Sequence, residues 1–454
     1  MKKLVALFLA AMMLLSVCAL AEAPEGYPEV NPDIDFGGKT LKIHCWYDMV
    51  RSAEPTDEEA ALYAYQDWLQ ETYNVKVEWT VDYAWDTSIT ALSEFVANPG
   101  DELAIYTMPL DFISAALTQN LLMPWNGLVD LTAEKWNQPA LEFMTIADKT
   151  MAVFSGGLEP REVVFFNKTL LEEANIDPDY IYDLQANGQW TWDAMIDLFA
   201  KVQKDRDGDG TVDLWASSGD GSDLALGAMA NNGAAFYRLD ENGDIVVSVN
   251  EEAAIEALEF VQKIRSNYFR HAQTDAEGNT ENWDYFKLGF PAGDFVFRFG
   301  QSYEGFNGDR EMNVEGFEWG CVAFPTGPRQ AAGDHKTIVS DNLVCIPNVY
   351  KNGEEKMIAF FWDQWSNPTP GYEDDDEGWI GNKYNFTDDR AVEETYAMLR
   401  EPEHGIRDYY IFLGGKNDTL GPDLIWPIDS QPAAALVESI LPIFQARADD
   451  FNNK

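Results

Sequence analysis

Residues 188–216 read GQWTWDAMIDLFAKVQKDRDGDGTVDLWA and predict a capped helix that runs directly into an acidic loop. Thr191 suits the N-cap position, because its hydroxyl can accept a hydrogen bond from an unpaired amide of the first turn. Lys204 places a positive charge at the expected C-terminus of the helix, where it is favourable. One face is expected to be buried, since apolar residues recur at helical spacing: Met195, Leu198, Phe199 and Val202.

The loop that follows spaces its oxygen-bearing side chains as the first part of an EF-hand calcium loop does. Its ligand positions one, three, five, seven and nine are Asp205, Asp207, Asp209, Thr211 and Asp213, with Gly210 at the sharp turn. Position twelve is Ala216 instead of a bidentate Glu, so an EF-hand sensor is not expected. We predict a structural calcium site, because four nearby carboxylates repel one another without a cation. The alternative is a solvated Asp/Gly turn.

The length and charge of the chain restrict its class. A chain of 454 residues exceeds one hydrophobic core and predicts two domains. It has 31 Lys and Arg against 78 Asp and Glu, a net charge of -47. Nucleic acids and anionic membrane surfaces would be repelled by this charge, so neither is expected as a partner.

Residues 1–21 predict a secretory signal peptide. Lys2 and Lys3 precede an apolar run over residues 4–17, and Ala19-Leu20-Ala21 offers a cleavage site. An alternative is a lipoprotein signal in which Cys18 is lipidated, although Val17 stands where a small residue is expected. The mature protein is therefore expected in the cell envelope or the extracellular space. Residues 22–37 are Pro-rich and acidic and predict a flexible leader.

The cysteines and the other reactive residues do not indicate an enzyme. The mature chain keeps Cys45, Cys321 and Cys345, an odd number, which predicts buried thiols, although Cys321 and Cys345 could pair. No C-x-x-C pattern, H-E-x-x-H pattern or nucleophile elbow is present. A glycoside hydrolase that uses two carboxylates stays open as the least favoured function, since a chain with 78 acidic residues always offers a pair.

Apolar and helical patterns alternate along the first part of the chain. Strands are predicted at 41–45, 75–81 and 103–106, and helices at 56–73, 87–97 and 112–118. This order is typical of an α/β fold with a mostly parallel sheet that has helices on both faces.

Several segments resemble the family 1 extracellular solute-binding proteins, the maltose-binding-like receptors of bacterial ABC importers. The helix start WTWD and the loop DRDGDGTVD resemble part of their second lobe, and FFNKTLLEEANI is similar to a run of Asn-Lys-aliphatic residues there. Further resemblance lies in FKLGFPAGDFVFRFG, EWGCVAFPTGP and SDNLVCIPNVYKNGEEKMIAFFWDQWSNP. Together the similar segments span roughly residues 40–366 in the family's order.

The resemblance implies a two-lobed periplasmic-binding-protein fold, type II-like, in which crossing strands form a hinge. We predict that lobe one comprises residues 38–145 and 292–333, and lobe two residues 146–291 and 334–454. A ligand is then expected in the cleft, at the carboxyl ends of the strands.

A sugar or oligosaccharide is the expected ligand of this cleft. The chain has 15 Trp, 19 Tyr and 26 Phe, and aromatic planes pack against the C–H faces of sugar rings. The candidates taken from predicted strand ends and loop ends are Trp46, Tyr47, Asp48, Tyr106, Thr107, Trp215, Asp341 and Asn342. The resemblance adds Phe299, which stands where the family has a stacking aromatic residue. The segment 219–224, where the family has another sugar contact, has no aromatic residue.

The expected partners are the solute and the ABC permease subunits that the resemblance implies, and the receptor is expected to be a monomer that delivers its solute unchanged. A receptor of the same fold for a peptide or another polar solute is the main alternative. Apart from calcium, no cofactor is predicted.

Overall fold

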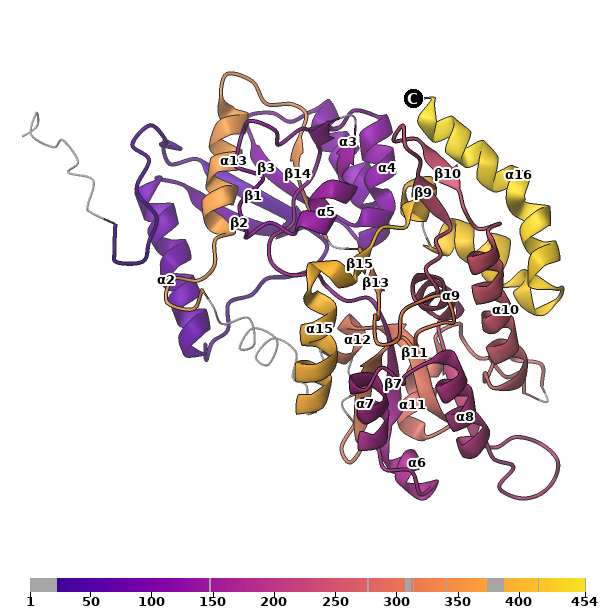
Figure 1. Cartoon of the computed structure of the whole chain (residues 1–454). Helices are drawn as coiled ribbons and strands as arrows, with labels where there is room; N and C mark the ends of the chain where they lie inside the picture. Colours follow the sequence, from indigo (N-terminus) through magenta and orange to yellow (C-terminus); the bar gives the residue numbers. More distant parts are fainter. Residues whose placement is uncertain are drawn as a thin grey trace, which may run out of the picture.

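The protein forms two α/β lobes, each built around its own β-sheet (Figure 1). The computed structural model describes residues 23–146, 148–275, 277–306, 312, 314–340, 342–373, 388–414 and 416–453, with the side chains of 417–419 left out. The predicted signal peptide, Cys18 and Asp341 lie outside the described residues.

Lobe one contains a five-stranded sheet in the order β2-β1-β3-β14-β4. The strands are β1 (Thr40–Cys45), β2 (Lys76–Val81), β3 (Leu103–Met108), β4 (Leu122–Met123) and β14 (Leu343–Pro347). β1 pairs in parallel with β2 and β3, whereas β14 is antiparallel to both of its neighbours. The helices of this lobe are α2 (Asp57–Thr72), α3 (Ser88–Ala97), α4 (Leu110–Thr118), α5 (Gln138–Phe143) and α13 (Glu354–Trp365).

Lobe two contains a four-stranded sheet in the order β12-β7-β11-β8. The strands are β7 (Glu162–Asn167), β8 (Trp215–Gly219), β11 (Phe295–Gln301) and β12 (Trp319–Ala323). Only β11 and β8 run parallel; β7 is antiparallel to β11 and to β12. The prediction of a mostly parallel sheet in each lobe is therefore wrong for lobe two. The sequence of a buried apolar strand does not indicate whether the strand runs parallel or antiparallel to its neighbours.

Helices cover the second sheet on both sides (Figure 1). The described helices of lobe two are α6 (Lys168–Glu173), α7 (Asp179–Ala186), α8 (Trp192–Val202), α9 (Gly221–Ala230), α10 (Glu252–Asn267), α11 (Tyr285–Ala292), α12 (Tyr303–Phe306), α15 (Ala397–Arg400) and α16 (Ala433–Asn452), of which α10 and α16 pack outside α9. A small hairpin of β9 (Tyr237–Leu239) and β10 (Ile245–Val247) lies against α16, and a short pair joins β13 (Thr337–Ile338) to β15 (Gly405–Ile406).

The helix α8 confirms the prediction made from its sequence. The Thr191 hydroxyl accepts a hydrogen bond from the Ala194 amide at 3.3 Å and caps the helix. All four predicted core residues are buried: Met195, Leu198, Phe199 and Val202. The helix ends at Val202, two residues earlier than Lys204, because Lys204 instead bonds Leu214 across the base of the acidic loop.

The sheets correct the predicted division of the chain into lobes. The segment 292–333 was predicted in lobe one, but its strands β11 and β12 pair with β7 of lobe two. Conversely, β14 and α13 were predicted in lobe two and belong to lobe one, where Figure 1 shows α13 among the N-terminal elements. Because β11 and β14 are both buried apolar strands, their sequences do not reveal which sheet each one joins.

Two of the segments that carry the chain between the lobes are neighbours. The amide of Val153 donates to the carbonyl of Val344 at 3.0 Å, and the Val344 amide donates back at 2.9 Å. Further along, Arg161 donates from its backbone amide to the Thr337 hydroxyl and from Nε to the Ser340 carbonyl, both at 2.8 Å. The two segments thus cross side by side as a hydrogen-bonded pair.

Residues 23–37 pack against lobe one, in contrast to the predicted flexible leader. The ring of Tyr27 lies 5.2 Å from that of Tyr65 and 5.0 Å from that of Trp68, both on α2. Phe36 is buried, with its ring 5.5 Å from that of Phe361 on α13. These aromatic contacts give a charged, Pro-rich segment an apolar anchor.

The three cysteines of the described chain are free and buried. Cys321 is on β12 in lobe two and Cys345 is on β14 in lobe one, so the two strands belong to different sheets. Burial raises the pKa of both thiols. The prediction of buried thiols is confirmed for these three residues.

The substitution Gly219→Ala is expected to destabilise lobe two strongly. Gly219 ends β8 with φ of 136°, and a Cβ there would lie 2.1 Å from the Phe299 carbonyl oxygen of β11. Gly243, in the β9–β10 turn, also has a positive φ of 85° but no atom within 4 Å of an added Cβ. Gly243→Ala should therefore lower the free energy of unfolding by only about 1–2 kcal/mol, which is the cost of an alanine in the left-handed region. Gly219→Ala should lower it by more. Urea unfolding midpoints measure both, and equal shifts would contradict the close approach of the strands.

Candidate ligand-binding cleft

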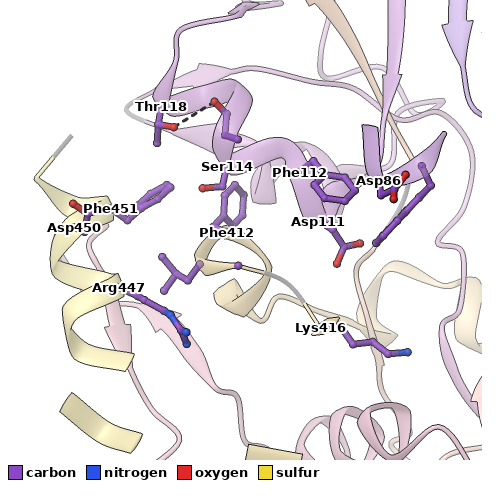
Figure 2. Close-up of a pocket in the computed structure, with 14 residues that line it drawn as sticks. Asp86, Asp111, Phe112, Ser114, Thr118, Phe412, Lys416, Arg447, Asp450 and Phe451 are labelled. Carbon is purple, nitrogen blue, oxygen red and sulfur yellow. Dashed lines mark hydrogen bonds between the residues drawn. The ribbon is translucent and has the colours of Figure 1, made fainter. Parts of the chain in front are cut away.

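A pocket of about 540 Å³ lies between α4 of lobe one and the C-terminal segments that belong to lobe two (Figure 2). Its lining from lobe one consists of Trp85, Asp86, Asp111, Phe112, Ser114, Ala115 and Thr118. Its lining from the C-terminal segments consists of Phe412, Leu413, Gly414, Lys416, Arg447, Asp450 and Phe451. A solute in this pocket would contact both lobes at once.

The wall from lobe one follows directly from the sheet topology. The short turn η1 (Trp85–Thr87) comes after β2, and α4 begins two residues after β3. These segments leave the carboxyl ends of parallel strands, which is where ligands bind in open α/β sheets. The rings of Trp85 and Phe112 pack edge to face at 4.7 Å, and Trp85 is 37% exposed, so an indole surface remains accessible.

The opposite wall comes from η4 (Tyr409–Leu413), η5 (Lys416–Ile425) and the last turns of α16. The ring of Phe412 lies 4.9 Å from that of Phe143 on α5 and 5.8 Å from that of Phe451 on α16. These contacts fix Phe412 at the junction of the two lobes. Figure 2 shows it opposite the α4 side chains.

A buried charge network lies at one end of the pocket, around Lys416. Its ammonium group is 2.5 Å from the Asp223 carboxylate and 3.0 Å from that of Asp220, both on the N-terminal side of α9. Burial alone would lower the pKa of Lys416, but these two carboxylates raise it above its ordinary value. The Lys416 amide also donates to the carboxylate of Asp111 on α4, so the network joins the two lobes.

Glu162, at the start of β7, is a second buried acid beside this network. Its carboxylate accepts a hydrogen bond from the Ile338 amide at 3.2 Å. Burial, reinforced by the charge of Asp223, raises the pKa of Glu162 to about 7. Gln301, at the end of β11, donates to the same Asp223 carboxylate at 3.0 Å. The edge of the second sheet that faces lobe one is therefore polar and rich in carboxylates.

Four of the predicted binding residues gather at the carboxyl ends of β1 and β3. Tyr47 and Thr107 share a side-chain hydrogen bond, and burial raises the pKa of Tyr47 to about 12. The ring of Trp46 meets that of Tyr47 edge to face at 5.2 Å, and Asp48 follows them, exposed. The structure brings these residues together on lobe one, next to the crossing segments, but they do not line the pocket.

Other predicted residues are placed away from any ligand surface. Tyr106 is 3% exposed and stacks on His44 with ring centres 4.5 Å apart. Phe299 is fully buried and packs between Phe199 and Phe324, which corrects its assignment as a stacking residue. Trp215 begins β8, whereas the ligand-facing end of that strand is at Gly219.

Two candidates remain, Asn342 and Asp341. Asn342 is half-buried just before β14, and Asp341 is outside the described residues.

None of the residues that line the pocket was among the predicted binding residues. Trp85 and Asp111 follow β2 and β3 within a few residues, so the rule that selected Trp46 and Thr107 could have found them too. Phe412, Lys416 and Arg447 come from the C-terminal part of the chain, which carries little of the family resemblance. No sequence signal places these three residues opposite α4.

The acidic loop between α8 and β8 lies at the outer end of lobe two, far from α4 in Figure 1. Carboxylate oxygens of Asp205, Asp207 and Asp209 lie within 4.8 Å of one another. The Asp205 carboxylate accepts the amides of Gly208 at 2.6 Å and Gly210 at 2.8 Å, and its pKa is lowered by these bonds.

The rest of the loop is folded by its own carboxylates in the same way. Asp209 accepts the amide of Thr211 at 2.7 Å, and Asp213 accepts that of Arg206 at 2.6 Å. The loop is thus preorganised and presents converging carboxylate oxygens, the donors that Ca²⁺ prefers.

Comparisons with known proteins agree with this architecture. A family model described as bacterial extracellular solute-binding protein matches residues 64–360. No curated protein matches the sequence of the chain.

Solved structures of similar fold cover nearly the whole chain. A cyclic α-maltosyl-1,6-maltose binding protein from Arthrobacter globiformis is 16% identical, with a TM-score of 0.58, 92% of this chain covered and 99% of that one. UgpB from Mycobacterium tuberculosis in complex with glycerophosphocholine is 14% identical, with a TM-score of 0.58, covering 90% and 98%. The maltose-binding protein MalE from Listeria monocytogenes, in complex with maltose, is 14% identical, with a TM-score of 0.56, covering 91% and 96%.

The raised pKa of Glu162 predicts how stability depends on pH. Folded protein holds the Glu162 proton up to about pH 7, whereas unfolded chain releases it near the ordinary value of 4.5. Because the folded state binds more protons in this window, its stability falls as pH rises from 4.5 to 7. The Glu162→Gln variant keeps an acceptor for the Ile338 amide and has no proton to lose. As pH rises through this window, the free energy of unfolding of the variant is expected to increase by on the order of 1–3 kcal/mol relative to that of the wild type. Urea unfolding as a function of pH measures the difference, and parallel profiles would contradict it.

Proposed function

The chain belongs to the bacterial extracellular solute-binding proteins, and on that premise we propose that it binds a sugar or oligosaccharide between its lobes and delivers it unchanged to an ABC permease. The observation that carries this proposal is the interlobe pocket, with aromatic rings on both walls and charged groups around them.

The lining of the pocket suits a carbohydrate. Sugar rings expose C–H faces that pack on aromatic planes, and Trp85 and Phe412 offer such planes from opposite lobes. Sugar hydroxyls need fixed donors and acceptors, which Asp111, Ser114 and Lys416 supply. A solute held by both walls adds contacts that exist only when the lobes are close together, so binding favours the closed arrangement.

The crossing segments fit a hinge for this closure. They are a hydrogen-bonded pair, so rotation of one lobe against the other can be taken up at a few backbone positions without unfolding either sheet. Delivery to a permease then requires reopening, which breaks contacts between the walls but leaves both sheets intact.

Two of the similar structures are described as binding maltose or a cyclic maltosyl-maltose, which supports a saccharide. UgpB in complex with glycerophosphocholine shows that a protein of this fold also takes a solute of another class. A receptor for a peptide or another polar solute is therefore the second candidate.

We also propose an extracytoplasmic location, which the family's description as extracellular supports. Within the residues that the structure describes, none of the helices combines the length and the apolar composition needed to cross a bilayer. Release by signal cleavage is preferred to lipid attachment through Cys18.

A panel of saccharides and peptides screened by thermal shift and then by calorimetry tests the proposal. At least one saccharide is expected to bind with one-to-one stoichiometry, and Trp85→Ala should weaken it about tenfold or more, because stacking and burial are lost together. Trp283 is 75% exposed and does not line the pocket, so Trp283→Ala is the matched control and should bind normally. Binding of peptides alone would favour the second candidate, and hydrolysis of any glycan by the pure protein would overturn the receptor proposal.

We propose that the acidic loop holds a structural Ca²⁺. Chelator is expected to lower the thermal midpoint by about 2–4 °C for each kcal/mol of lost binding energy, because calcium stabilises only the folded loop. Asp205→Asn should lower the midpoint and remove the chelator effect. Asp240→Asn is the control, since Asp240 organises a similar turn between β9 and β10 without a cluster of carboxylates. An unchanged midpoint in chelator, with no calcium by elemental analysis, would contradict the proposal.

A further inference from the structure

His44, on β1, lies between two carboxylates of lobe one. Its Nδ1 is 2.8 Å from the carboxylate of Asp82, directly after β2, and its Nε2 is 3.1 Å from that of Glu102, directly before β3. The side chain of His44 is only 5% exposed. A neutral imidazole carries one N–H, so both bonds can form only when the ring is protonated. The geometry therefore fits an imidazolium between β1, β2 and β3.

The two carboxylates differ in how much they depend on His44. Glu102 also pairs with Lys42 at 2.5 Å. Burial would raise the pKa of Glu102, but the hydrogen bonds from Lys42 and His44 lower it below its ordinary value. Among the described residues, Asp82 has an ion pair with His44 alone. Asp82 therefore loses more than Glu102 when the charge of His44 is lost.

The other groups that face His44 are aromatic and neutral. The ring of Tyr106 on β3 stacks on that of His44 with centres 4.5 Å apart, and the ring of Phe95 on α3 lies 6.1 Å away. Tyr83 stacks in turn on Tyr106 at 6.0 Å. Burial raises the pKa of both tyrosines, so neither is ionised near neutral pH. Histidine is the side chain whose charge ordinarily changes between about pH 5 and 8, so a change of charge in this cluster in that range is assigned to His44.

Asp82 begins the segment that leads to Trp85 in the pocket wall. The next residue, Tyr83, is buried, and its hydroxyl lies 2.9 Å from the carbonyl oxygen of His44 and 2.6 Å from that of Thr107. Trp85 follows two residues later, at the start of η1. Asp82 and Tyr83 thus attach this segment to the carboxyl ends of β1 and β3, and the attachment through Asp82 is the one that depends on charge.

We propose that His44 is a positioning residue for the pocket: its bond to Asp82 fixes the segment that carries Trp85, and this bond weakens when the ring loses its proton. The inference rests on the proposed function and adds a pH-dependent control of the same site. In the neutral ring, the charged part of the Asp82 bond is lost whichever nitrogen keeps its hydrogen. The indole of Trp85 then samples more positions, and the pocket offers a solute a less preorganised wall at higher pH.

The test follows Trp85 directly and needs no solute. The full chain is labelled with 5-fluorotryptophan, and the fluorine NMR signal of Trp85 is identified as the one that is missing from the spectrum of Trp85→Phe. In the wild type, this signal is expected to shift and broaden as pH rises from about 5 to 8, the range in which histidines titrate.

Two variants remove the charge pair from either side. His44→Gln keeps a polar side chain that cannot be charged, so the Trp85 signal is expected near its high-pH position at every pH. Asp82→Asn changes a side chain that is 42% exposed, so it tests the same bond even if His44→Gln does not fold. It should also remove most of the response to pH.

The matched control is His271→Gln, the same substitution in lobe two, where the His271 ring bonds the carbonyl of Arg265. This variant should keep the wild-type response of Trp85. Asp86 and Asp111, which line the pocket with Trp85, are present in all of these variants. A response that came from either of them would therefore persist in His44→Gln.

The outcomes distinguish this inference from the function on which it rests. A Trp85 signal that ignores pH in the wild type, or that responds equally in His44→Gln, overturns the role of His44 and leaves the saccharide receptor intact. If Trp85 responds as expected but no saccharide of the panel binds, the receptor proposal fails, and the positioning of Trp85 by His44 stands.

Discussion

The arrangement of the whole protein depends on the pair of hydrogen-bonded segments that cross between the lobes. Val153 and Val344 exchange backbone bonds, and Arg161 ties the first segment to Thr337 and Ser340 of the second. Both segments are anchored in sheets, so a rotation of one lobe against the other can be taken up in this pair. The segments that follow β2 and β3 then face the C-terminal segments of lobe two, and the pocket forms between them.

Lys416 connects polar groups from three parts of the chain. Its ammonium group forms ion pairs with Asp220 and Asp223, and its backbone amide donates to Asp111 on the other lobe. A buried cation with several carboxylates is costly to break, because removal of one member leaves uncompensated charge away from water. The network therefore specifies how the C-terminal segments are placed against α4.

The predictions from the sequence are right for features that depend on local patterns. They are wrong for features that depend on the pairing of strands distant in sequence. The N-cap Thr191 and the helices predicted at 56–73 and 87–97 follow from short-range chemistry and are confirmed. The lobe boundaries were wrong, because β11 and β14 have equally apolar sequences and join different sheets. Among site residues, the strand-end rule selected Tyr47 and Thr107, which lie together on lobe one but do not line the pocket. Phe299 was wrong because an inward-facing ring at a strand end looks identical in sequence to an outward-facing one. Phe412 and Lys416 could not be found, since only the tertiary fold brings η4 and η5 opposite α4.

The position of β14 has a consequence for biogenesis. This strand is inserted between β3 and β4, and the helix α13 that follows completes the aromatic core around Phe36 and Tyr73. A nascent chain that ends before residue 343 therefore has a split first sheet with an unpaired edge on β3, however long it has been outside the ribosome. Completion of the first sheet must wait until about three quarters of the polypeptide has been synthesised, because β14 begins at residue 343 and pairs with strands far away in sequence. Such a delay keeps the leading portion loosely structured during synthesis, a state suited to threading through a narrow export channel.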